Sequence, residues 1–255
     1  MPRANSRAPT LTCRRLLLAA ALFAALWVAA MADAKPPSVE QHSFEFNGIR
    51  RAYYGFAPPA DSEDPPLLIV LHGSYGSARQ MLNAWTALAS EEGLLLLAPQ
   101  ARDRKVWSIR ADGPAFIRAL VDEVQRRHPL DRERIYLFGY SGGAVYALTL
   151  SMIESEYFAA VAVYGGVWRA SNEFAALRYA RRKVPIAIFM GERDEFFPSF
   201  AVRNTQRALE EAGHEVNLTI LGYVAHDYGQ VAEKVNRDAW NFLKRRRLNS
   251  SRRGL

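Results

Sequence analysis

The sequence has a single cysteine, Cys13, among its 255 residues. Cys13 lies near the N-terminus, ahead of an apolar run from Leu16 to Ala30. A chain body without cysteine cannot form disulfides, use a thiol nucleophile or bind a metal through thiolates. Any chemistry of this protein therefore has to come from other side chains.

Long apolar runs are also lacking. The run from Leu16 to Ala30 is shorter than the roughly 20 residues that a membrane-spanning helix needs. It follows Arg14-Arg15 and leads to Ala32-Asp33-Ala34, the pattern of a secretory signal with a small-residue cleavage site. We predict a signal peptide over residues 1–34 and export to the periplasm or the extracellular medium. The paired arginines leave both the general and the twin-arginine export routes open.

Positive charge is scarce in the body of the chain. The formal net charge is +7, but residues 1–34 carry +3 and residues 244–255 carry +6, so residues 35–243 sum to −2. A body with this charge predicts no nucleic-acid partner. The basic C-terminal tail, residues 244–255, has two interpretations: charges that stabilise a helix C-terminus, or weak association with an anionic envelope surface.

Short apolar runs alternate with segments of helical period from residue 67 onward. The runs are typical of parallel strands that are covered on both faces, and they are Leu67–Leu71, Leu94–Ala98, Ile135–Phe138, Ala159–Tyr164, Val184–Met190 and Val216–Leu221. The helical segments are residues 78–91, 113–127, 142–154, 171–182, 199–212 and 230–246.

An antiparallel hairpin is predicted before these runs, because Asn47-Gly48 is a favoured two-residue turn between Ser43–Gly48 and Arg50–Pro58. We therefore expect one α/β domain over residues 35–243. Its sheet is mostly parallel and open, with an antiparallel N-terminal hairpin and helices on both faces. A β/α barrel is the alternative at this length.

The strongest local motif is Gly139-Tyr140-Ser141-Gly142-Gly143, which lies between an apolar run and a helical segment. A G-x-S-x-G sequence in this position is typical of a nucleophile elbow. We predict Ser141 as the nucleophile and the backbone N–H of Gly142 as an oxyanion donor. Tyr140 is a candidate substrate-binding residue.

A serine nucleophile needs a base and a carboxylate that orients the base. Asp194 and His226 follow two later predicted strands, at the sheet edge where open α/β sheets carry their sites. We predict His226 as the base and Asp194 as the acid. The alternative carboxylates are Glu192, Glu195 and Asp227, and three further histidines are expected at the surface: His42, His128 and His214.

The segment His72-Gly73-Ser74-Tyr75-Gly76 follows the first predicted parallel strand, where a second oxyanion donor is expected. The backbone N–H of Ser74 is the predicted donor, and Tyr75 is the alternative. Tyr75 is also a candidate substrate-binding residue.

Together these motifs, with residues 130–136 and 225–228, resemble those of secreted α/β-hydrolase esterases. The group includes polyhydroxybutyrate depolymerase-like and feruloyl esterase-like proteins. The resemblance covers most of residues 42–243 and implies the α/β-hydrolase fold, with hydrolysis of carboxylic esters through a Ser-His-Asp triad and an acyl-enzyme. Relatives of this group often have a tryptophan in the loop after the fourth strand, so the resemblance makes Trp107 a candidate substrate-binding residue, either a wall of the site or a buried anchor. The sequence has no metal, nucleotide or flavin motif, so we expect no cofactor. The alternatives are a serine peptidase acting on small peptides and a non-catalytic binding protein of the same fold.

Overall fold

The computed structural model describes residues 38–58 and 64–248. The predicted signal segment and residues 249–255 of the predicted tail lie outside these ranges. None of the helices in the described ranges is long and apolar enough to cross a membrane.

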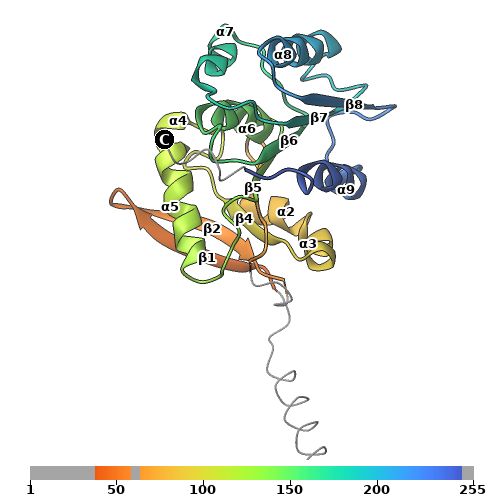
Figure 1. Cartoon of the computed structure of the whole chain (residues 1–255). Helices are drawn as coiled ribbons and strands as arrows, with labels where there is room; N and C mark the ends of the chain where they lie inside the picture. The colour runs from red at the N-terminus through yellow and green to blue at the C-terminus, as the bar shows by residue number, and fades with distance from the viewer. Residues whose placement is uncertain (1–37, 59–63, 249–255) are drawn as a thin grey trace, which may run out of the picture. The chain divides into compact units, whose positions relative to one another are not determined.

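The described chain is built on an eight-stranded sheet with the order β1-β2-β4-β3-β5-β6-β7-β8 (Figure 1). The strands are β1 (Glu40–Phe46), β2 (Ile49–Phe56), β3 (Leu67–Leu71), β4 (Leu95–Pro99), β5 (Ile135–Tyr140), β6 (Ala160–Tyr164), β7 (Ile186–Gly191) and β8 (Val216–Leu221). β1 and β2 pair antiparallel with their neighbours, and all other pairs are parallel. The predicted architecture is confirmed. A barrel is excluded, because β1 and β8 are open edges.

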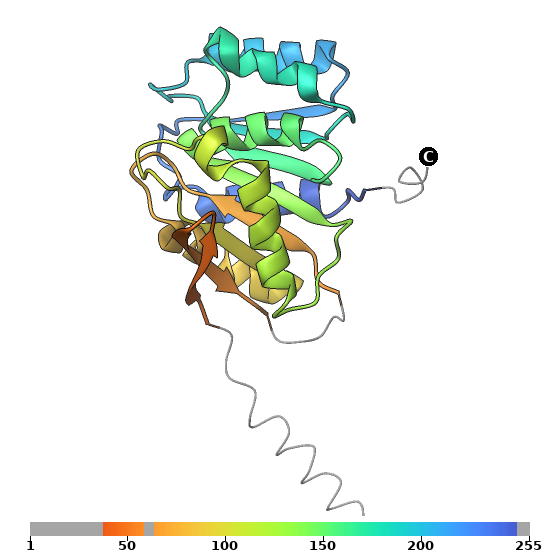
Figure 2. The same ribbon diagram turned by 90° about the vertical axis from the view of Figure 1, so that its left-hand side faces the viewer.

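Helices cover both faces of the sheet, as the apolar strands require (Figure 2). One face packs against α5 (Pro114–Gln125), α6 (Gly142–Ile153) and α8 (Ser199–Glu211), and the other against α2 (Ala78–Asn83), α3 (Thr86–Glu92) and α9 (Ala232–Leu243). Because side chains alternate along a strand, Leu67, Ile69 and Leu71 join the first layer. Leu68 and Val70 join the second.

Two predicted helices differ from the structure. The segment 78–91 is divided into α2 and α3 around Trp85, whose ring is fully buried and packs edge-on against Phe138 at 4.8 Å between centroids. The segment 171–182 shortens to α7 (Ser171–Phe174) and a 3-10 turn, η1 (Ala175–Tyr179). Its last N–H groups, on Arg181 and Arg182, donate to the Ser155 hydroxyl instead of to helical carbonyls.

The N-terminal hairpin is confirmed, and its turn explains the sequence found there. Asn47 and Gly48 have φ angles of 51° and 71°. Two consecutive left-handed residues suit the right-handed twist of a hairpin, and Asn and Gly adopt this conformation at low cost.

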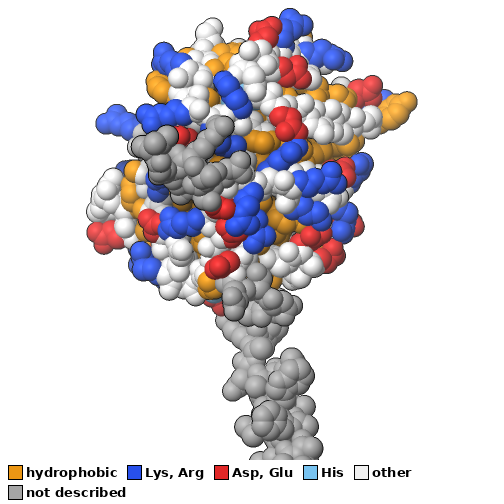
Figure 3. All heavy atoms as spheres, in the orientation of Figure 1, with side chains coloured by type: hydrophobic (Ala, Val, Ile, Leu, Met, Phe, Trp, Pro, Cys, Tyr) orange, Lys and Arg blue, Asp and Glu red, His pale blue; other side chains and the backbone are white. Residues whose placement is uncertain are grey.

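The start of the basic tail is held against the domain. Lys244 pairs with Glu92, Arg246 with Glu215, and Arg247 with Glu133 and Asp131. Leu248 is buried and donates its N–H to the Glu133 carbonyl. Basic and acidic side chains are interspersed on the face that carries α9 (Figure 3). These ion pairs favour the structural interpretation for residues 244–248.

Candidate active site

Ser141 lies between β5 and α6 in a strained backbone conformation, with φ 53° and ψ −120°. Few non-glycine residues adopt such angles, and those that do concentrate at functional sites. The flanking glycines allow the turn. A Cβ on Gly139 would lie 2.3 Å from the Gly143 carbonyl oxygen, and one on Gly143 would lie 2.4 Å from the Leu71 carbonyl oxygen. The close approach of strand and helix therefore depends on glycine at both positions.

The structure brings the predicted nucleophile, base and acid together. His226 Nε2 lies 2.9 Å from Ser141 Oγ, and His226 Nδ1 lies 2.7 Å from Asp194 Oδ2. The other oxygen of Asp194 accepts hydrogen bonds from the backbone N–H groups of Phe196 and Phe197, at 3.0 and 2.9 Å. An imidazole that donates from Nδ1 to a carboxylate presents Nε2 as an acceptor for the serine hydroxyl.

The alternative carboxylates have other partners or face solvent. Glu192 accepts the N–H of Tyr223 at 3.0 Å, and Asp227 accepts the N–H of Gly229 at 2.9 Å. Glu195 is exposed. Asp194 is thus the carboxylate that contacts the imidazole, and its side chain is only 1% exposed.

Aromatic side chains hold the His226 loop in place. The ring of Tyr140 stacks on the imidazole with 5.3 Å between centroids, and its hydroxyl donates to the His226 carbonyl at 3.1 Å. Tyr164 donates to the Ala225 carbonyl at 3.3 Å. Burial, followed by the charges of Asp227 and Asp194, raises the pKa of Tyr140, so its hydroxyl remains a donor. Tyr140 therefore positions the base and also lines the cleft.

The Ser74 loop approaches the elbow closely at Gly142. A Cβ on Gly142 would lie 3.3 Å from the Ser74 nitrogen. Neither the Ser74 nor the Gly142 N–H donates to an acceptor within the ranges that the structure describes. The Tyr75 N–H, in contrast, donates to the Arg104 carbonyl at 2.6 Å. Ser74 and Gly142 are thus the pair available to an incoming oxyanion.

His72 connects this loop to the segment that follows β4. Its Nδ1 lies 2.8 Å from the Gly73 carbonyl oxygen, and its Nε2 accepts the N–H of Ala101 at 3.1 Å. Burial lowers the pKa of His72. A neutral ring, with one donor and one acceptor, fits both contacts. A second buried histidine is His214, which contacts Val184, so the expectation of a surface position for His214 is wrong.

The candidate residues open into a cleft of about 780 Å³. Tyr75 lies at its mouth and is 69% exposed. Trp107 is both wall and anchor: it lines the cleft, and its buried ring stacks on Tyr146 while Nε1 donates to the His72 carbonyl at 2.8 Å. Ser141, His226 and the three candidate substrate-binding residues therefore share one site.

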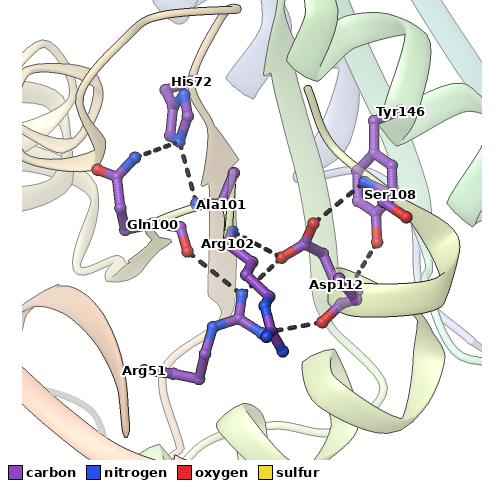
Figure 4. A network of polar contacts seen from close by, with 9 residues as sticks. Arg51, His72, Gln100, Ala101, Arg102, Ser108, Asp112 and Tyr146 are labelled. Atoms are coloured by element: carbon purple, nitrogen blue, oxygen red, sulfur yellow. Dashed lines mark hydrogen bonds and ion pairs between the residues drawn. The ribbon is translucent and has the colours of Figure 1, made fainter. Parts of the chain in front are cut away.

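A buried ion pair that the sequence did not reveal supports the Trp107 segment (Figure 4). Arg51 on β2 contacts Asp112 at 2.5 Å, and Asp112 also accepts the N–H groups of Arg102 and Ser108, each at 3.0 Å. Both charged side chains are almost completely buried. No local pattern marks this pair, because its partners lie 61 positions apart.

Within residues 38–58 and 64–248, no group of three or more His, Cys, Asp or Glu side chains is arranged to hold a metal ion. The chemistry that the geometry offers is proton transfer between a serine hydroxyl and an oriented imidazole, beside two free N–H donors.

Comparison with curated proteins finds relatives that are named esterases or depolymerases. The bifunctional acetylxylan esterase/xylanase XynS20E of Neocallimastix patriciarum is 27% identical over 152 residues, which is 58% of this chain and 22% of that protein. Poly(3-hydroxyalkanoate) depolymerase C of Paucimonas lemoignei is 25% identical over 189 residues, or 68% of this chain and 44% of that one. The chain thus spans less than half of the length of these curated relatives.

Solved structures share the fold. The poly(3-hydroxybutyrate) depolymerase LpqC of Bordetella parapertussis superposes with a TM-score of 0.62 at 18% identity, covering 84% of this chain and 92% of that one. The family model for phospholipases and carboxylesterases matches residues 109–244, which include the elbow, the acid and the base. The chain therefore belongs to the phospholipase/carboxylesterase family of α/β-hydrolases.

Proposed function

We propose that this protein is an exported serine esterase that hydrolyses carboxylic esters. The observation that carries the proposal is the chain of hydrogen bonds that joins Ser141 Oγ to His226 and His226 to Asp194. Ser141 and His226 line the cleft. The family is that of phospholipases and carboxylesterases, and the relative XynS20E is named an acetylxylan esterase/xylanase, which supports the same substrate class. Export rests on the predicted signal segment, residues 1–34.

The proposed reaction has two halves. His226 Nε2 accepts the hydroxyl proton of Ser141 as Oγ attacks the ester carbonyl carbon, and the N–H groups of Ser74 and Gly142 stabilise the oxyanion. The tetrahedral intermediate collapses, and the alcohol leaves with the proton from His226. Water then gives a proton to His226 and attacks the acyl-enzyme, and Ser141 is released with its proton restored.

The first prediction tests the nucleophile. Replacing Ser141→Ala should abolish hydrolysis of 4-nitrophenyl acetate and labelling by a fluorophosphonate probe, because the attacking oxygen is gone. The fold should remain, because the alanine Cβ occupies the position of the serine Cβ. Release of 4-nitrophenol, probe labelling and thermal unfolding measure these three outcomes.

Ser90→Ala is the matched control, because Ser90 is exposed on α3 and does not line the cleft. It should keep both activities. A folded Ser141→Ala protein with wild-type hydrolysis would contradict the proposed mechanism. Hydrolysis of peptide 4-nitroanilides at rates similar to those for esters would favour the serine peptidase alternative. A folded wild-type protein that the fluorophosphonate probe does not label would favour the alternative of a non-catalytic binding protein.

A further inference from the structure

The catalytic cleft contains an arginine that no step of the proposed reaction uses. Arg169 lies in the loop between β6 and α7, is exposed, and lines the cleft together with Ser141 and His226. We propose that its guanidinium binds a carboxylate carried by the ester substrate, either on the acyl arm or on the alcohol arm. This inference rests on the proposed esterase function and concerns its specificity.

Two contacts fix the guanidinium near the reacting groups. Arg169 Nη1 donates to the Phe196 carbonyl at 2.9 Å, and its Cζ lies 4.6 Å from the centroid of the Phe197 ring. The Phe197 ring in turn stacks on His226 with 5.8 Å between centroids. A single aromatic ring therefore separates the positive charge from the base. An ordered guanidinium loses less side-chain entropy on binding than a free one.

The charge of Arg169 has no carboxylate partner in the part of the chain that the structure describes. Its Nε and Nη2 donate to no described acceptor, and it forms no ion pair there. Glu173 also lines the cleft, but its Oε2 accepts the backbone N–H groups of Arg169 and Ala170, at 2.6 and 2.8 Å. The Glu173 carboxylate is thus directed to the backbone.

The donors that remain suit a carboxylate. Nε–H and the outward N–H of Nη2 lie side by side in a guanidinium, with the spacing of two carboxylate oxygens. Among the residues of the described cleft lining, Arg169 is the one lysine or arginine. Half-esters of dicarboxylic acids and esters of hydroxy acids carry a carboxylate within reach of a cleft of this size.

Two pairs of esters that differ only in this charge test the proposal. Mono-4-nitrophenyl glutarate and its methyl ester place the carboxylate on the acyl arm, and 4-acetoxybenzoate and its methyl ester place it on the alcohol arm. In at least one pair, we expect the wild-type kcat/KM to be about tenfold higher for the ester that carries the carboxylate than for its methyl ester, mainly because KM is lower. Arg169→Gln should remove this preference, and Arg169→Lys should keep part of it.

Arg193→Gln is the matched control, because the Arg193 guanidinium lies over Tyr223 and does not line the cleft. It should keep the preference. Equal preferences in wild type and Arg169→Gln, or no preference in wild type for either pair, would overturn the proposal. If Arg169→Gln lowered kcat/KM equally for the charged and the neutral esters, the proposal would also be overturned, since Arg169 would then act only by holding Phe196.

Binding separates this proposal from the proposed function. Calorimetric titration of Ser141→Ala and of Ser141→Ala/Arg169→Gln with monomethyl glutarate should give a Kd about tenfold weaker for the double variant. Equal Kd values would contradict a carboxylate site. Wild-type protein that hydrolyses none of the four esters would contradict the esterase function, and the titration would still decide the role of Arg169.

Discussion

Gly142 combines two requirements in one residue. Its backbone N–H is a proposed oxyanion donor, and its lack of a side chain lets the Ser74 loop approach the elbow, because a Cβ would lie 2.5 Å from Ser74 Oγ and 3.3 Å from the Ser74 nitrogen. A side chain at this position would push the Ser74 loop away from the elbow, although the fold would not need to change.

Gly142→Ala should therefore lower kcat for 4-nitrophenyl acetate by about 10²–10³, the usual loss for one oxyanion donor. The urea unfolding midpoint should change little. Gly222→Ala is the control, because a Cβ there meets nothing closer than 3.9 Å, at Glu192 Oε2, and it should keep full activity. Wild-type kcat in Gly142→Ala would exclude the proposed oxyanion site.

His72 links stability to pH. Burial lowers its pKa in the folded protein, whereas an unfolded chain has a histidine pKa of about 6.5. The unfolded state therefore binds the proton more readily, so this contribution to stability is complete above pH 6.5 and is lost as the pH falls below it. Protonation would also remove the acceptor that His72 Nε2 offers to Ala101.

We expect the free energy of unfolding, measured in urea, to fall between pH 7.5 and 5. Burial also lowers the pKa of His42 and His214, which should add to the slope. His72→Gln keeps a polar side chain in the loop. Its free energy of unfolding should fall less steeply with decreasing pH than that of wild type, and the two slopes should differ by up to about 1.4 kcal/mol per pH unit. Identical slopes for wild type and His72→Gln would show that His72 makes no such contribution.

At the scale of elements, the local sequence is sufficient to predict a strand or helix where a single hydrophobic pattern, such as a short apolar run, determines it. Leu67–Leu71 and Val216–Leu221 were predicted with the bounds that the structure shows. The division of segment 78–91 was not predictable, because it depends on burial of Trp85 against a distant strand. Likewise, motif and chain order were enough to predict Ser141 and His226, but they left Glu192, Glu195 and Asp227 as alternatives to Asp194. Only the contact with the imidazole distinguishes Asp194 from them. The Arg51–Asp112 pair exists only through tertiary packing.

The Arg51–Asp112 pair is the clearest target for an element-scale prediction. Arg51→Met should lower the free energy of unfolding by about 3–5 kcal/mol, because it leaves the buried Asp112 carboxylate unpaired. Adding Asp112→Asn should recover part of this loss. Urea unfolding measures both effects.

An exposed pair provides the comparison. Lys234 and Asp238 are 64% and 40% exposed, so Lys234→Met should cost less than about 0.5 kcal/mol. If Arg51→Met were no more costly than Lys234→Met, the buried pair would not be what holds the segment that carries Trp107.

At the scale of the whole molecule, the distribution of charge separates three parts of the chain. Three of the four cations in residues 244–247 are paired with carboxylates of the domain, so a search for a polyanionic partner belongs with the exposed Arg245 and with Arg252 and Arg253, which lie outside the described residues. The +3 of residues 1–34 belongs to the predicted export signal, which is testable on its own.

In a bacterial host, the protein recovered from the periplasm or medium should begin at Lys35, because signal peptidase requires small residues at Ala32 and Ala34. Intact-mass spectrometry of the fractions measures this. Ala32→Lys should block processing and leave the full-length chain with the membrane fraction. Recovery of full-length wild-type protein in the medium would contradict the predicted cleavage.

Contacts within the chain fix the loop that carries Ser74. The Tyr75 N–H donates to the Arg104 carbonyl, His72 accepts the N–H of Ala101, and Trp107 donates to the His72 carbonyl. If Ser74 and Gly142 are the oxyanion donors, as proposed, the fold itself orients their dipoles, and the free energy of this alignment is incurred during folding instead of in each turnover. When enzyme and ester are mixed, the release of product over time should accordingly show an initial burst or a straight line, and never a lag.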